Sequence, residues 1–209
     1  MTDAERGLLW AIRIRTPRLV LRLPTDDELA ELYGVAAGGI HPPEEMPFAV
    51  AWTDDLTEDA VTAYHRAAWD SWTPERWSCN FVTFLDDRVI GMQGIGAEQF
   101  ARTRAVSTGS WLGAPFQRRG YGTEQRAAVL EFAFRGLGAE AASSGALVDN
   151  RASQRVSDKL GYRVTGMSEV APRGEPVPHY DYRLERDDWR CPVTVELENV
   201  EPARGLFGA

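Results

Sequence analysis

Short stretches of alternating apolar and polar residues predict a sheet that involves most of the chain. Residues 18–23 place three leucines on one face, which is the pattern of a half-buried strand. The runs 79–85 and 89–95 are joined by three polar residues and predict an antiparallel hairpin. The same pattern predicts the remaining strands at residues 107–113, 146–148, 163–171 and 179–184.

Helical segments lie between these strands. The acidic residues after Thr25 are typical of the first turn of a helix, and a second helix is expected over residues 57–72. Apolar residues then recur at helical spacing from Thr123 to Phe134 and form one stripe, and the glycines that follow end that helix. A fourth helix is expected to run to Lys159.

The segment 117–123, Gln-Arg-Arg-Gly-Tyr-Gly-Thr, separates a strand from the third of these helices. Gly120 and Gly122 remove side chains where the backbone turns tightly and approaches another molecule. The first N–H groups of the helix and the positive end of its dipole point into the same loop, and Arg118 and Arg119 add positive charge. This combination predicts a site for a phosphate or pyrophosphate.

Two familiar phosphate loops do not fit this segment. A dinucleotide loop requires a third glycine, and Gln125 stands in its place. A P-loop requires a lysine after a glycine, and none follows here. A solvated turn whose glycines only end a strand is the alternative that the loop by itself leaves open.

Further motifs follow the loop in a fixed order: Glu124, then Asn150 and Ser153, then Lys-Leu-Gly-Tyr at residues 159–162. Together with the loop, they resemble the RimJ/RimL-like branch of the GNAT N-acyltransferase superfamily, most strongly over residues 107–166. The chain looks most similar to actinobacterial members of that branch, some of which depend on succinyl-CoA.

The resemblance implies an α/β (α+β) fold with a single GNAT domain. Its mixed, largely antiparallel sheet would have about seven strands, flanked by about four helices. We expect residues 1–190 to form the acyltransferase domain and residues 191–209 to form a C-terminal extension. The extension would supply an extra strand or a dimer arm, and we expect it to pack on the body because its apolar residues would otherwise be exposed.

The resemblance also implies where acyl-CoA binds. Its pantetheine arm would lie between two diverging strands, and its pyrophosphate would lie on the N–H groups of residues 117–123. For Asn150 and Ser153, helix capping is the alternative, and Tyr162 is also typical of a core aromatic residue. The implied cofactor-binding residues are Trp111, Leu112, Gly113, Gln117, Arg118, Arg119, Gly120, Tyr121, Gly122, Thr123, Asn150 and Ser153.

Acyl transfer to an amine requires a deprotonated amine, a polarised carbonyl group and a proton for the leaving sulfur. The tyrosine that many GNAT enzymes use as the acid is replaced by Ser157. Some members of this branch use the serine of the Asn-x-x-Ser motif instead, so the resemblance implies Ser153 as a catalytic candidate beside Ser157. The glutamate that some relatives use as a base is replaced by Thr108. The general base stays open, and each candidate is more typical of an ordinary surface or structural group: Glu98, His41 and Asp181.

A loop rich in proline and glycine, residues 36–52, and a second proline-rich loop, residues 172–178, interrupt the regular elements. The prolines argue against regular strand in the second loop. Analogous segments flank the acceptor cleft in the GNAT fold, so the resemblance implies that Met46, Phe48 and Trp52 contact the substrate.

These observations predict an enzyme that moves an acetyl or succinyl group from acetyl-CoA or succinyl-CoA to a primary amine, by direct attack in a ternary complex. The acceptor is a small molecule or a protein amine. Neither Cys79 nor Cys191 has a histidine and a carboxylate nearby in the sequence, so no nucleophile is apparent. The alternatives are a catalytically weak GNAT-derived module that binds CoA or a metabolite, and a phosphate- or nucleotide-binding protein of another fold.

Composition narrows this picture mainly by exclusion. An apolar content of 44% and a charged content of 26% are typical of a globular protein. No apolar run approaches the length of a membrane span, and the N-terminus lacks the order of a signal peptide, so a cytoplasmic protein is expected. The net charge of −8 argues against nucleic acid as a partner. The two cysteines form no metal-binding motif, and a homodimer is left open.

Overall fold

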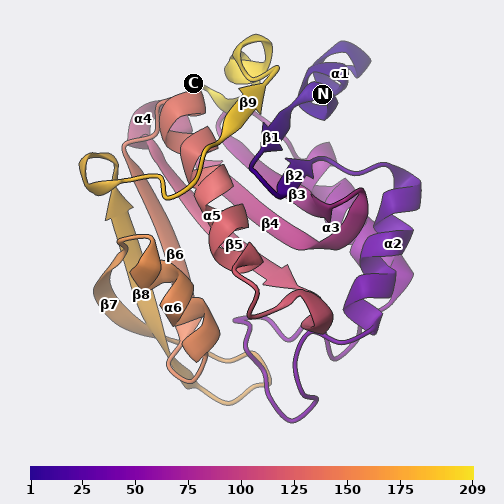
Figure 1. Cartoon of the computed structure of the whole chain (residues 1–209), viewed down its shortest axis with the longest axis vertical. Helices are drawn as coiled ribbons and strands as arrows, with labels where there is room; N and C mark the ends of the chain where they lie inside the picture. Colours follow the sequence, from indigo (N-terminus) through magenta and orange to yellow (C-terminus); the bar gives the residue numbers. More distant parts are fainter.

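A mixed sheet of nine strands runs through the computed structural model, which describes residues 1–209 (Figure 1). The strand order is β7-β8-β6-β5-β4-β3-β2-β1-β9, and every neighbouring pair is antiparallel except β5 and β6. The strands are β1 (Arg13–Arg15), β2 (Leu19–Arg22), β3 (Arg76–Leu85), β4 (Arg88–Glu98), β5 (Ala105–Leu112), β6 (Ala141–Leu147), β7 (Arg163–Val170), β8 (Val177–Glu185) and β9 (Glu196–Glu198).

Local capping explains where several helices begin. The hydroxyl of Thr25 accepts the N–H of Glu28, whose carboxylate accepts the N–H of Thr25, and Thr2 and Glu5 repeat this capping box. None of the helices is both long and apolar enough to cross a bilayer. The helices are α1 (Asp3–Ala11), α2 (Asp26–Ala37), α3 (Glu58–Asp70), α4 (Phe100–Thr103), α5 (Tyr121–Glu131) and α6 (Arg151–Lys159), with short helical turns η1 (Ala114–Phe116), η2 (Phe132–Leu137), η3 (Arg186–Asp188) and η4 (Glu201–Phe207).

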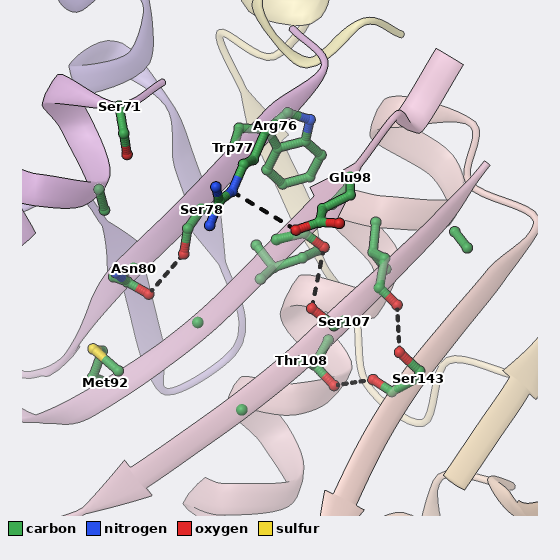
Figure 2. A pocket seen from close by; sticks show the side chains of 18 of the residues that line it. Ser71, Arg76, Trp77, Ser78, Asn80, Met92, Glu98, Ser107, Thr108 and Ser143 are labelled. Atoms are coloured by element: carbon green, nitrogen blue, oxygen red, sulfur yellow. Dashed lines mark hydrogen bonds and ion pairs between the residues drawn. The ribbon is translucent and has the colours of Figure 1, made fainter. Parts of the chain in front are cut away.

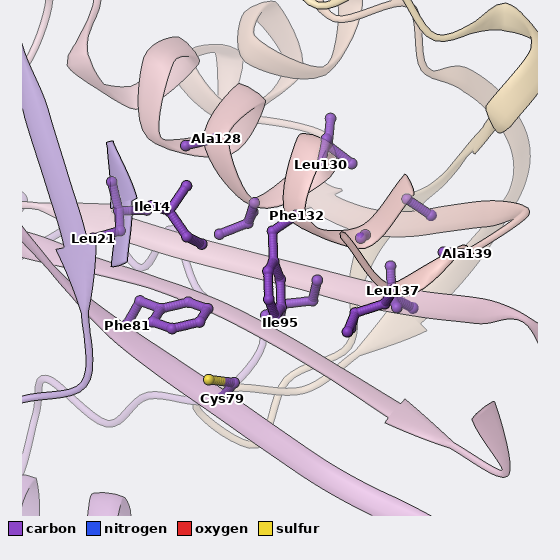
Figure 3. Close-up of a cluster of buried hydrophobic side chains, with 14 of the residues drawn as sticks. Ile14, Leu21, Cys79, Phe81, Ile95, Ala128, Leu130, Phe132, Leu137 and Ala139 are labelled. Carbon is purple, nitrogen blue, oxygen red and sulfur yellow. The ribbon is translucent and has the colours of Figure 1, made fainter. Parts of the chain in front are cut away.

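Successive residues of β3 divide the core between the two faces of the sheet. Phe81 belongs to the larger cluster, in which it packs with Ile95 against Phe132, just beyond α5 (Figure 3). Val82 belongs to the second cluster, which contains Trp69 and other apolar residues of α2 and α3. Because the side chains of a strand alternate between faces, one strand supports both layers.

The predicted α/β GNAT fold class is confirmed, but the predicted number of elements was too low. The two additional strands, β1 and β9, have only three residues each and pair with one another at the edge of the sheet. Strand β9 lies within residues 191–209, where an extra strand was one of the two expectations, whereas β1 and the helices α1 and α4 were not predicted. The expectation that the connection 172–178 contains no strand is wrong at its end, because β8 begins at Val177. Pro178 is accommodated there because its carbonyl accepts the N–H of Val148 and the start of a strand does not require its missing N–H.

Helix α5 is buried more completely than its single apolar stripe suggested. Glu124, Gln125 and Arg126 are each less than 5% exposed, as are the apolar residues that follow them. Each of these polar side chains has hydrogen-bond partners from the sheet or from the chain before β2, which offsets the cost of burying it. The helix is therefore a central element, with its N-terminus fixed in position.

The C-terminal residues pack into the same core as the rest of the chain. Phe207 is fully buried and makes edge-to-face contacts with Trp72, Trp77 and Phe132. The indole N–H of Trp77 donates to the carbonyl of Phe207 at 3.0 Å. The body of the fold and its last turn therefore share one hydrophobic cluster.

This packing predicts a large effect on stability when the last aromatic side chain is truncated. Phe207→Ala removes a buried ring and leaves a cavity among three aromatic neighbours, so we expect the free energy of unfolding to fall by about 3–5 kcal/mol. Chemical denaturation measures this change. Glu201→Ala, at an exposed position of the same turn, is the control and should change it by no more than about 0.5 kcal/mol. A similarly small loss for Phe207→Ala would show that the tail does not stabilise the core.

Candidate active site

The central feature of the site is the separation of β5 from β6. The two strands pair only over Ala105–Ser107 and Ala141–Ser143, although they continue to Leu112 and Leu147. A cavity of about 360 Å³ lies where they diverge, and we call it the donor cavity. It is lined by residues of both strands, by residues 47–49 and by Arg126, Asn150, Ser153 and His179.

A larger cavity, the α3 groove, adjoins the donor cavity. It has a volume of about 760 Å³ and lies between α3 and strands β3, β4 and β5 (Figure 2). Its polar lining is mostly uncharged, and its one ion pair joins Arg76 to Glu98 at 3.7 Å. Both cavities are lined by Ser107, Thr108, Gly109 and Ser143, so they meet at the point where the strands begin to diverge.

The glycine loop presents a row of free N–H groups at the other end of β5. The N–H groups of Arg118, Arg119 and Gly120 donate no hydrogen bond within the protein, and the next three belong to the first turn of α5, which leaves them unbonded. Gly120 has a φ of 87°, which favours glycine. The side-chain amide of Gln117 donates to the carbonyls of Leu112 at 2.8 Å and Ile40 at 2.7 Å. These groups fit a bound pyrophosphate.

Arg18 supports this loop and was not identified from the sequence. Its guanidinium donates to Glu124 at 2.7 Å and to the carbonyl of Arg119 at 3.2 Å, and it lies 4.5 Å from the centre of the Tyr121 ring. The buried Glu124 also accepts the hydroxyl of Thr16 at 2.6 Å. Glu124 therefore ties the chain before β2 to the start of α5. No sequence spacing links residue 18 to a loop about 100 positions away.

Asn150 connects helix α6 to the loop before α3. Its amide oxygen accepts the N–H of Ser153 at 3.0 Å, and its amide nitrogen donates to the carbonyl of Pro47 at 3.0 Å. Asn150 therefore caps the helix and also lines the donor cavity. The hydroxyl of Ser153 lines the same cavity and has no partner in the protein. Ser157, by contrast, is fully buried and lines neither cavity, and its hydroxyl has no partner.

A row of aromatic side chains joins the predicted acceptor loop to β5. Trp111 lies 5.5 Å from Trp52, which lies 5.2 Å from Phe48, measured between ring centres. Phe48 lines the donor cavity, whereas Trp52 packs against the Phe48 ring and lines neither cavity. Met46, the third predicted substrate contact, lines neither cavity.

Arg126 is a buried cation that no carboxylate neutralises. Its side chain extends from α5 and donates to Gln93 at 3.2 Å, Ser144 at 2.8 Å and Ser110 at 3.0 Å. These three residues belong to β4, β6 and β5, and all three are neutral. Arg126 is 3% exposed and lines the donor cavity. The cavity therefore contains a positive charge that the sequence motifs did not indicate.

Residues 18–163 match the family model described as an acetyltransferase (GNAT) domain, which is more than half of the chain. The chain belongs to the GNAT acetyltransferase family. This assignment confirms the predicted superfamily and the predicted class of enzyme. The loop at residues 117–123 and the separated strands lie within the matched range.

Solved structures of GNAT proteins share the fold at low identity. Mycobacterium smegmatis RimJ in complex with a CoA disulfide is 17% identical with a TM-score of 0.68, and the match covers 84% of this chain and 86% of RimJ. The ribosomal α-N-protein acetyltransferase RimL in complex with coenzyme A is 16% identical with a TM-score of 0.68, covering 81% and 95%. A GNAT-family acetyltransferase from Bacillus anthracis is 18% identical with a TM-score of 0.66, covering 84% and 99%.

The base candidates taken from the sequence are poorly placed in this GNAT fold. Both ring nitrogens of His41 are hydrogen-bonded, to Pro42 and to Thr53, and His41 lines neither cavity. Glu98 lines the α3 groove, but its side chain is 80% exposed and paired with an arginine. Asp181 lines neither cavity.

The two thiols are also remote from the donor cavity. Cys79 is fully buried in the larger core cluster, and burial raises the pKa of its thiol well above the usual value. Cys191 donates to the carbonyl of Val193, and burial likewise raises its pKa. Neither residue lines the donor cavity or the α3 groove.

The loop geometry predicts that a larger side chain at Gly122 impairs CoA binding without unfolding the protein. A Cβ atom at this position would make ordinary contacts, at 3.7 Å with Leu112 and 3.8 Å with Val156. We therefore expect Gly122→Val to fold and to bind CoA at least about tenfold more weakly, a loss of about 1.4 kcal/mol or more. Calorimetry measures the affinity. Gly34→Val, a helical glycine with no atom within 4 Å of the added Cβ, is the control. Unchanged affinity in Gly122→Val would remove the loop from the CoA site.

Proposed function

We propose that this GNAT protein is an N-acyltransferase that moves an acyl group from a CoA thioester to a primary amine, by direct attack in a ternary complex. The observation that carries the proposal is the meeting of the donor cavity and the α3 groove at Thr108 and Gly109. A donor entering between β5 and β6 and an acceptor entering beneath α3 would reach the same short segment of β5. Two substrates can then be held together without competing for one space.

The donor side fits the parts of a CoA thioester. The free N–H groups from Arg118 to Thr123 would hold the pyrophosphate, and the outer edge of β5 from Thr108 to Gly113 would hold the pantetheine arm. When bound, the CoA thioester supplies the activated acyl group. Coenzyme A is present in the RimJ and RimL structures that share this fold, which supports the same use of the loop here.

The acceptor side is polar, and the two loops predicted to flank it are joined to each other by an ion pair. Asn80 lines the α3 groove, and its amide oxygen accepts the hydroxyl groups of Tyr64 at 3.5 Å and Ser78 at 3.4 Å. Arg173 donates two hydrogen bonds to Asp54, at 2.7 and 2.8 Å, and thereby joins the loops 42–54 and 172–178. This pairing lowers the pKa of Asp54. We propose a protein or small-molecule amine as the acceptor, and the α-N-protein acetyltransferase RimL favours the former.

Arg126 favours succinyl-CoA over acetyl-CoA as the donor. A buried cation is costly unless an anion or several dipoles compensate it, and here only neutral groups do so. The terminal carboxylate of a succinyl group would supply the missing negative charge, whereas an acetyl group would not. A charged hydrogen bond of this kind contributes about 1.5–3 kcal/mol.

A pair of donors with the same chain length tests this preference. Succinyl-CoA and butyryl-CoA both carry a four-carbon acyl chain, and only the first ends in a carboxylate. We expect kcat/KM to be at least about tenfold higher with succinyl-CoA. Arg126→Gln keeps hydrogen-bonding capacity without the charge. In this variant the ratio of kcat/KM with succinyl-CoA to kcat/KM with butyryl-CoA should approach one. Equal use of both donors by the wild type, or a preference for acetyl-CoA, would assign Arg126 a purely structural role.

Ser153 is the proposed donor of a hydrogen bond to the leaving sulfur. Its free hydroxyl lines the donor cavity, whereas Ser157 lies outside it. We expect Ser153→Ala to lower kcat by about 10- to 1,000-fold with little change in CoA affinity. Ser157→Ala is the matched variant on the same helix. A loss of kcat in Ser157→Ala but not in Ser153→Ala would assign the role to Ser157. If Ser153 only supports the helix start, the free energy of unfolding falls by about 0.5–1 kcal/mol and kcat stays unchanged.

The alternative function is a module that binds CoA without turning it over, and the missing tyrosine at position 157 favours it. Release of free thiol from acetyl-CoA and succinyl-CoA, measured with and without a mixture of amines and peptides, separates the two. Amine-dependent thiol release supports the enzyme. CoA binding without any thiol release supports the module.

A further inference from the structure

The donor cavity contains only two ionisable side chains, Arg126 and His179. Arginine stays protonated in proteins, so it accepts no proton from an amine. His179 lies on β8, which pairs with β6 along the whole length of β6. It is the one residue of the cavity lining whose side chain offers a basic nitrogen lone pair, on its neutral imidazole.

A carboxylate fixes the orientation of the His179 ring. Its Nδ1 lies 3.3 Å from a carboxylate oxygen of Asp181, and the same oxygen accepts the hydroxyl of Ser168 at 3.1 Å. An ionised carboxylate only accepts hydrogen bonds, so Nδ1 carries the proton and Nε2 carries the lone pair in the neutral ring. Nε2 has no hydrogen-bond partner within the protein.

The backbone of β6 leaves room for this ring only because residue 145 is glycine. A Cβ atom on Gly145 would overlap the His179 ring at Cε1 and Nε2. Gly145 lines the donor cavity as well, so the free nitrogen of the ring lies at the cavity wall. The register of the sheet explains the arrangement, since Gly145 pairs with Asp181 and Leu147 pairs with His179.

We propose that His179 is the general base of the transfer and that Asp181 orients it, an inference that rests on the proposed function. Nε2 accepts one proton from the acceptor ammonium and later passes it to solvent. The free amine forms a C–N bond with the thioester carbonyl carbon, and the C–S bond breaks. The sulfur leaves with the electrons of that bond and takes the second proton from the nitrogen, so atoms and charges balance.

The other groups that face His179 do not compete for this role. Its neighbours on β7 and β6 are Ser168 and Gly145, and the nearby loop contributes apolar residues 47–49 to the cavity. The charged group in contact with it is Asp181, on its own strand, and Arg126 lines the same cavity. Asp181 is turned toward the ring and lies outside the cavity lining, which suits a positioning residue.

The test compares three variants of the whole protein in the presence of an amine acceptor. The donor is succinyl-CoA or butyryl-CoA, whichever the wild type uses better. We expect His179→Gln to lower kcat at least about 100-fold and to leave CoA affinity, measured by calorimetry, unchanged. It should also abolish the acidic limb of the pH profile of kcat/KM, because that limb reports protonation of the general base. Asp181→Asn should lower kcat less. Gly145→Ala, which displaces the ring without changing it, should lower kcat as His179→Gln does, and combining the two should add little.

A second measurement does not depend on turnover. The chain has three histidines, so long-range ¹H–¹⁵N correlation spectra of the free protein resolve each ring. We expect His179 to show the Nδ1–H tautomer in the wild type and to lose it in Asp181→Asn. His41→Gln is the control, and it should keep both the tautomer and the acidic limb.

The outcomes separate the base from the function as a whole. An active wild type with full kcat in a folded His179→Gln protein overturns the base proposal and leaves the acyltransferase in place. The Nε2–H tautomer at His179 overturns it as well. A wild type that binds CoA but releases no thiol with any amine overturns the proposed function and the base together.

Discussion

Every part of the site depends on the early end of the pairing between β5 and β6. Parallel strands that separate after three paired residues leave main-chain groups without partners, which is costly in a protein interior. Side chains supply part of the missing partners. The hydroxyls of Ser144 and Thr108 donate to the carbonyls of Thr108 and Ser143, and the amide of Gln117 donates to the carbonyl of Leu112. Arg126 lies beneath the gap and donates to one residue from each of β4, β5 and β6. The Arg126 guanidinium thus links β4, β5 and β6 by hydrogen bonds at the level where β5 and β6 are not paired.

The phosphate loop is positioned by contacts on both of its sides. At its start, Gln117 donates a hydrogen bond to the end of β5. At its end, Glu124 in the first turn of α5 accepts hydrogen bonds from Thr16 and Arg18, which precede β2. Because α5 is buried along its length, its N-terminus has little freedom to move. The free N–H groups of the loop are therefore ordered in the absence of an anion. Binding of an anion would then carry little entropic cost for ordering them.

The sequence alone predicted those features of the fold and the site that depend on residues close together in the chain. The capped start at Thr25, the glycine loop at residues 117–123 and the capping residue Asn150 each depend on neighbours within a few positions. Arg126 and His179 could not be found in this way, because the sheet brings them to the cavity from distant segments. His179 reaches it only through the register of β8 on β6, which no short motif encodes. Ser157 was a plausible candidate by spacing, but its position on α6 turns its side chain into the core.

The side chains of the donor cavity also bear on whether the acyl group is first transferred to the protein. A covalent acyl-enzyme intermediate requires a nucleophile that reaches the thioester and then faces the amine. Both thiols lie outside the donor cavity, and burial keeps them protonated by raising their pKa. The cavity offers hydroxyl groups instead, and a serine needs an adjacent base aimed at its oxygen to become nucleophilic. The Nε2 atom of His179 has no hydroxyl partner, so it is free for the incoming amine. These side chains therefore support the proposed direct transfer between two bound substrates.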